Sequence, residues 1–259
     1  MSYCLLQADS VAPGADQLKR AFKSLKTLTG ADAVKLANDA CGVLVKNLSH
    51  DDAGLLQRAL QSEGVPTEIV EAGRLPRLPD AKNVRRMEFR PEALLIYDPL
   101  GRTVPVPWEH LALLSAGAVR HFDLSATRTE QSVTTFDPVR GMRTRIVTEV
   151  RHKVQDDSRL ILDILVSGGL MRFQIEAGTF MFKYCFDRPE LSLPQKLGLL
   201  MQMIASHAPQ AVLNRGATAL RDGALDNAAY ASVAALFDES IWLLWRTAKK
   251  SDAPGGLPA

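Results

Sequence analysis

The feature that most constrains the fold is the change of hydrophobic period within about the first seventy residues. Residues 3–7, 42–48 and 67–70 are short runs rich in apolar and β-branched side chains, and they predict strands. Between these runs, apolar residues recur at intervals of three and four, which is the period of a helix buried on one face. A chain that alternates in this way is expected to cover one small sheet with helices.

The helix boundaries are predicted from the residues that flank the periodic segments. The first helix is expected over residues 16–28 and the second over residues 31–39. Ser49, followed three residues later by Asp52, has the pattern of an N-cap and predicts a third helix. The fold class is therefore α+β, and residues 1–74 are predicted to form a βααβαβ domain.

This part of the sequence resembles the C-terminal domain of the bacterial ribosomal stalk protein. Residues 21–30, AFKSLKTLTG, look like the first helix and turn of that domain. Residues 32–49 match the spacing of its second helix and the strand that follows, and residues 51–64 match its third helix. The resemblance covers residues 15–71. The adaptor that hands substrates to a bacterial AAA+ protease shares this architecture.

In the stalk family, lysines on the first helices contact translational GTPases. The resemblance implies that Lys23, Lys26 and Lys46 are the corresponding contact residues here. Lys19 lies one helical turn before Lys23 and joins the same face by spacing. Such a cluster would attract an acidic protein partner and raise its rate of association. The alternative is that these lysines form an ordinary solvated helix face.

The sequence beyond the first domain is richer in predicted strands. Residues 75–83 contain two prolines and several charges and are predicted to be a linker. Residues 84–215 alternate short apolar runs with turns and end in a helical segment, apart from a polar stretch at 125–141 that we interpret as a loop. Many strands closed by a helix predict a barrel or roll that resembles the pleckstrin-homology architecture.

The C-terminal part is predicted to be one amphipathic helix over residues 225–249, followed by a flexible tail at 250–259. Trp242 and Trp245 place a large apolar area near the end of this helix. Three interpretations remain open for them. They dock the helix on the neighbouring sheet, they form a contact in a homo-oligomer, or they contact a membrane surface together with the basic end of the helix.

The sequence contains no recognisable catalytic or metal-binding motif. Its three cysteines have no CxxC spacing, and its five histidines have no metal-ligand spacing. The phosphate-binding glycine motifs and the GxSxG element are also absent from the sequence. We therefore predict no catalytic residue, no metal and no cofactor. An enzyme or small-ligand site in the strand-rich part, using His110, His152 or Arg145, is the alternative.

The charge balance argues against a nucleic-acid or membrane partner. The chain has 31 basic and 29 acidic residues, so no global field draws it to an anionic polymer. The stretch from Arg140 to Lys153 is locally basic but has no interleaved aromatic residues for base stacking. We expect no nucleic-acid binding, no membrane span and, without a signal-like N-terminus, a cytoplasmic location.

The function that the sequence favours is a non-enzymatic protein-binding adaptor or regulatory protein with an acidic partner. A small-ligand-binding protein or enzyme is one alternative. A structural subunit assembled through the last helix is another.

Overall fold

A computed structural model describes residues 1–39, 41–137, 141–167 and 170–251, and for residues 39, 120–157, 225, 226 and 251 it describes the backbone alone. The contacts divide the chain into two compact units. Residues 1–119 and 159–259 form the first unit, and residues 120–158 form the second. The described residues form six α-helices and three sheets, which confirms the α+β class.

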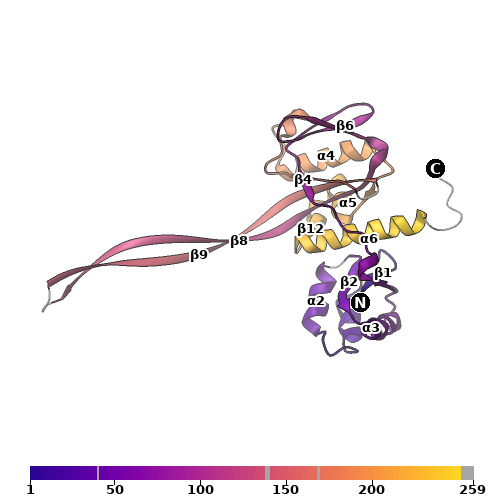
Figure 1. Cartoon of the computed structure of the whole chain (residues 1–259), viewed down its shortest axis with the longest axis horizontal. Helices are drawn as coiled ribbons and strands as arrows, with labels where there is room; N and C mark the ends of the chain where they lie inside the picture. Colours follow the sequence, from indigo (N-terminus) through magenta and orange to yellow (C-terminus); the bar gives the residue numbers. More distant parts are fainter. Residues whose placement is uncertain (40, 138–140, 168–169, 252–259) are drawn as a thin grey trace. The chain divides into compact units, whose positions relative to one another are not determined.

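The N-terminal part of the first unit has the predicted element order, β1-α1-α2-β2-α3-β3. The central strand β1 pairs antiparallel with both β2 and β3, and a core of leucines from the sheet and the helices joins the layers. Figure 1 shows this part in indigo and violet. The bounds are β1 Tyr3–Gln7, α1 Ala15–Phe22, α2 Gly30–Asp39, β2 Val43–Leu48, α3 His50–Ser62 and β3 Thr67–Glu71.

Two helix ends show how local hydrogen bonds set these bounds. Ser49 is the N-cap of α3, as predicted, and its Oγ accepts a hydrogen bond of 3.1 Å from the backbone N–H of Asp52. The first helix is shorter than predicted. After Phe22 the N–H groups of Lys23, Ser24 and Leu25 each donate to the carbonyl three residues earlier, and these tighter turns end α1.

The remaining strands of the first unit belong to two sheets. One is an antiparallel meander of β5 Arg86–Phe89, β6 Ala93–Tyr97 and β7 Thr103–Pro107. The other has the order β11-β8-β9-β10-β4, with β12 also paired to β8. Its strands are β4 Ala81–Asn83, β8 Leu111–Asp137, β9 Gly141–Val166, β10 Arg172–Glu176, β11 Val212–Leu213 and β12 Ala229–Tyr230.

These strands correct two predictions. The described strands form open sheets and no closed barrel, because β4 and β11 end the larger sheet and β5–β7 pair only with one another. Residues 125–137, predicted to be a loop, continue β8, and their partner in the sheet is β9. The second unit consists of these outer parts of β8 and β9. β4 lies within the segment predicted to be a linker.

The helices of the C-terminal half are α4 Leu193–His207, α5 Arg215–Arg221 and α6 Val233–Ser251. α4 packs against α5, and its apolar face joins the core below the larger sheet. α6 begins at Val233, later than predicted, because the preceding residues 229–230 are extended and pair with β8. α6, yellow in Figure 1, contacts both β2 of the N-terminal sheet and β12. It therefore connects the two cores of the first unit.

Candidate functional site

The four predicted lysines lie on the N-terminal α/β part, and the structure divides them into two pairs. Lys19 Nζ lies 3.4 Å from Asp16 Oδ1, and Lys46 Nζ lies 2.5 Å from Asp238 Oδ1 of α6. Lys23 and Lys26 are exposed, and neither has an ion pair among the residues that the structure describes. Lys23 and Lys26 are therefore the two predicted lysines whose charge is not offset by a carboxylate of the described residues.

An open groove of about 360 Å³ lies beside this lysine-bearing segment. Its walls come from α2, β2 and the first turns of α6, and they are mostly apolar. Phe22 and Leu28 also line it, so the segment that carries Lys23 and Lys26 begins and ends at the groove. The ion pair between Lys46 and Asp238 joins β2 to α6 at the groove wall.

Trp242 fixes α6 to the N-terminal sheet. Its side chain is 2% exposed, and its indole Nε1–H donates a 2.8 Å hydrogen bond to the carbonyl oxygen of Gln7 at the end of β1. Gly42 has a φ of +92°, and a Cβ there would lie 2.4 Å from the Cβ of Trp242, so only glycine fits. Trp245 packs partly buried in the same cluster, and its buried indole nitrogen has no hydrogen-bond partner among the described residues.

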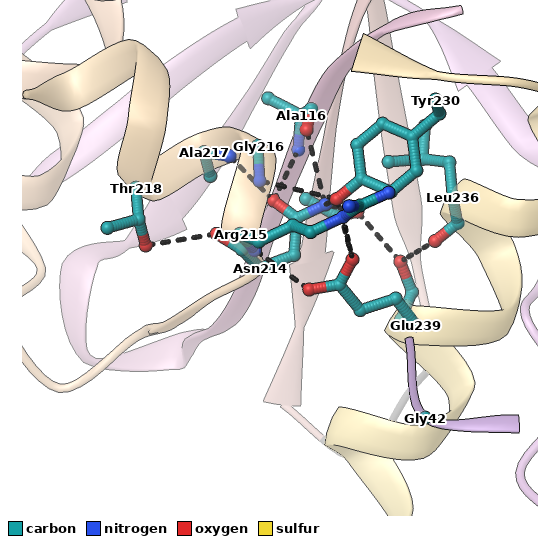
Figure 2. A network of polar contacts seen from close by, with 12 residues as sticks. Gly42, Ala116, Asn214, Arg215, Gly216, Ala217, Thr218, Tyr230, Leu236 and Glu239 are labelled. Atoms are coloured by element: carbon teal, nitrogen blue, oxygen red, sulfur yellow. Dashed lines mark hydrogen bonds and ion pairs between the residues drawn. The ribbon is translucent and has the colours of Figure 1, made fainter. Parts of the chain in front are cut away.

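α6 also meets a buried polar network, which Figure 2 shows. Asn214, the N-cap of α5, is 1% exposed. Its Oδ1 accepts hydrogen bonds from the N–H groups of Ala217 at 2.8 Å and Ala116 at 3.0 Å. Its Nδ2 donates to the Tyr230 hydroxyl at 2.8 Å, with the oxygens of Ser115 and Ala116 also within reach. Asn214 thus links α5 to β8 and β12.

Glu239 of α6 is the acidic member of this network. It is 2% exposed, and its Oε2 accepts a 2.6 Å hydrogen bond from the Tyr230 hydroxyl. Its Oε1 accepts from the backbone N–H of Arg215 at 2.8 Å, and the Arg215 guanidinium lies 3.5 Å from Oε2. The same guanidinium covers the Tyr230 ring at 4.4 Å, as Figure 2 shows. A buried carboxylate with these partners is well satisfied.

The close packing around Tyr230 depends on a glycine. A Cβ on Gly216 would lie 2.0 Å from the carbonyl oxygen of Ala116, which no side chain can accommodate. The absence of a side chain lets the Gly216 N–H approach the Tyr230 hydroxyl to 3.2 Å and donate to it. The hydroxyl therefore donates once and accepts twice, and its hydrogen-bonding capacity is filled.

The pKa shifts of the ionisable groups in and beside this network indicate a structural role and not a catalytic one. Burial raises the pKa of Tyr230 far above its usual value, and the negative charge of Glu239 raises it further. Burial likewise raises the pKa of the neighbouring Cys41 thiol to about 12, with Glu239 the next cause. Both groups hold their protons at neutral pH, so neither is activated as a nucleophile.

A second buried ion pair, between β9 and β10, also contacts α6. Arg172 of β10 lies 3.0 Å from Asp163 of β9, and both side chains are almost fully buried. Burial raises the pKa of Asp163, although the positive charge of Arg172 acts in the opposite direction. The guanidinium lies 4.2 Å from the ring of Phe237 on α6. The larger sheet therefore contacts α6 through two separate polar clusters.

Sequence reasoning missed Asn214, Tyr230 and Glu239, although one signal was available. Glu239 and Ser240 fall on the apolar stripe of the last helix, between Leu236 and Leu243, where a purely apolar contact would have no polar residue. A polar residue in such a stripe indicates a buried partner. Its partners on β8, α5 and β12 are distant in sequence, and nothing local identifies them.

Of the two histidines proposed for the enzymatic alternative, the structure describes the side chain of His110. His110 is exposed, and its carbonyl oxygen accepts a hydrogen bond from Ser167 Oγ at 2.9 Å. The side chains of His152, Arg145 and the rest of the basic stretch lie outside the described residues. Among the side chains that the structure does describe, no three of His, Cys, Asp and Glu gather as metal ligands would. In the same part of the chain, no helix has the length and apolarity needed to cross a membrane.

Comparisons with known proteins give no match: no family model, no curated protein and no solved structure is significantly similar to this chain.

Proposed function

We propose that this chain is a non-enzymatic protein-binding adaptor or regulatory protein whose N-terminal α/β part binds an acidic partner. The observation that carries the proposal is the exposure of Lys23 and Lys26 without a neighbouring carboxylate partner in the described structure. Two adjacent uncompensated cations steer an acidic surface toward them and raise its rate of association.

The charge of the surrounding segment supports the same partner. Residues 15–35 contain more cations than carboxylates: Lys19, Arg20, Lys23, Lys26 and Lys35 against Asp16 and Asp32. Lys19 is partly offset by Asp16, and Lys46 is held by Asp238. We therefore assign the main contribution to Lys23 and Lys26 and a smaller one to Lys19 and Lys46. The ribosomal-stalk-like architecture, the roll-like second part and a cytoplasmic location belong to this proposal as well.

Affinity capture with charge-reversed variants tests the proposal. Lys23→Glu/Lys26→Glu is compared with wild type and with Lys183→Glu/Lys250→Glu, which makes the same change in net charge at exposed lysines elsewhere. Circular dichroism first checks that both variants are folded. We expect acidic proteins captured by the wild type and by the control to be missing from the Lys23→Glu/Lys26→Glu sample. If all three capture the same proteins, the proposal is wrong.

A further inference from the structure

The groove beside the lysine-bearing segment has an apolar floor, and it lies next to the segment that carries Lys23 and Lys26. Leu28, Leu36 and Val45 line it and are only partly buried by the core against which they pack. Ala234 and Ala235 of α6 form the opposite wall, and their small side chains leave the groove open. Its volume of about 360 Å³ lies at the lower end of the range for ligand pockets, which suits a few side chains.

The carboxylates that line the groove are already engaged. Asp238 pairs with Lys46, and Asp32 accepts hydrogen bonds from the Thr29 N–H at 2.8 Å and the Thr29 hydroxyl at 2.6 Å. Lys35 also lines the groove and is exposed, and no ion pair holds it among the described residues. Asp32 keeps its negative charge, but Lys35 and the two lysines of the segment between Phe22 and Leu28 outnumber it, so the net charge around the apolar floor is positive.

We propose that this groove binds the apolar side chains of an acidic amphipathic segment of a protein partner, with the segment's carboxylates on Lys23, Lys26 and Lys35. This inference rests on the proposed function. It adds the place at which the apolar side chains of the partner bind. The charge complementarity selects this occupant, since a neutral apolar molecule would gain nothing from the three lysines. In such complexes, buried apolar side chains contribute most of the affinity, and charges at the rim raise the rate of association and orient the partner.

The probe is a synthetic glutamate-rich peptide with leucines at helical spacing, labelled with a fluorophore and titrated with the full chain. Two matched peptides replace the leucines by serine or the glutamates by glutamine. We expect each replacement to weaken binding by about tenfold or more, which corresponds to about 1.4 kcal/mol. A serine peptide that binds as tightly as the leucine peptide overturns the groove proposal. So does a leucine peptide that does not bind at all.

Two variants locate the binding site. Ala234→Trp fills the groove from an exposed position on α6, and Ala248→Trp makes the same change at an exposed position of the same helix that does not line the groove. We expect only Ala234→Trp to weaken leucine-peptide binding, by about tenfold. Independently of any variant, methyl NMR of the wild type should show peptide-induced shifts at Leu28, Leu36 and Val45. Shifts elsewhere with none at these methyls contradict the proposal.

The outcomes separate this inference from the proposed function. If Ala234→Trp binds the peptide normally while Lys23→Glu/Lys26→Glu loses the captured partners, the proposed function is retained. The proposal that the partner's apolar side chains bind in the groove is then wrong. If light scattering shows that Ala234→Trp lowers the mass of the chain in solution, the groove is a contact between copies of this chain, and the proposal is wrong.

Discussion

Replacing Tyr230 by phenylalanine tests whether the buried network holds α6 in place. The ring itself keeps its packing, because only the hydroxyl is removed. Three hydrogen bonds disappear with it: the donation to Glu239 at 2.6 Å, and the acceptance from Asn214 at 2.8 Å and from Gly216 at 3.2 Å. The losses are unequal, because Asn214 Nδ2 still has the oxygens of Ser115 and Ala116 within reach.

The magnitude follows from what each group loses. A hydrogen bond to a charged acceptor contributes about 1.5–3 kcal/mol, and a buried N–H left without a partner, here that of Gly216, costs about 1–3 kcal/mol. These contributions are coupled, so we expect the free energy of unfolding to fall by about 3 kcal/mol. With a urea m-value of about 3 kcal/mol/M, the midpoint of unfolding should fall by about 1 M.

Urea unfolding followed by circular dichroism measures this change. The control is Tyr184→Phe, which removes the same atom from an exposed tyrosine in the short turn at Phe182–Tyr184. The Tyr184 hydroxyl makes no hydrogen bond among the described residues. We expect the control to shift the midpoint by little. Equal, small shifts for both variants would refute the conclusion that the Tyr230 hydroxyl is part of a satisfied buried network.

Three further predictions concern other parts of the first unit. Gly216→Ala should destabilise the chain by about 2 kcal/mol or more, because the new Cβ would collide with β8. Gly54→Ala in α3, where nothing lies within 4 Å of the new Cβ, should stabilise it by about 0.5–1 kcal/mol. Thermal unfolding compares the two variants. Trp242→Phe loses the hydrogen bond to β1 and should cost about 1–2 kcal/mol in urea unfolding, and no change would argue against the docking of α6. Burial raises the pKa of Cys41 and Cys185 to about 12. At pH 8 their thiolate fractions should therefore be about a thousandfold lower than those of thiols with an unperturbed pKa. A thiol reagent should modify both cysteines quickly only after denaturation. These raised values favour the fold below pH 9, and that contribution should be lost as the pH rises toward 12, which pH-dependent unfolding can measure.

The sequence predicts elements well where short-range patterns determine them. β1 has the predicted bounds, and α3 begins at the Ser49 cap. In each case the decisive information is a local run of apolar residues or a cap pattern. The bounds proposed for the domains stay predictions.

The errors occur where contacts distant in sequence decide the structure. α1 ends at Phe22 although the apolar period continues to Leu28, because tight turns redirect the chain and still bury Leu25. α5 was missed because it has seven residues, too few for a clear period, and depends on its Asn214 cap. The groove could not be predicted, since one wall belongs to the N-terminal α/β part and the other to α6, which is distant in sequence.

The most direct test of the central claim is site-specific photo-crosslinking. A photoreactive amino acid replaces Ser24, which is exposed between Lys23 and Lys26, and in a matched chain it replaces the exposed Lys183. After irradiation in the presence of cell extract, mass spectrometry identifies the covalently attached proteins. We expect an acidic protein to be attached at position 24 and not at position 183. Attachment of the same proteins at both positions, or of none at position 24, would contradict the proposal that this surface binds an acidic partner.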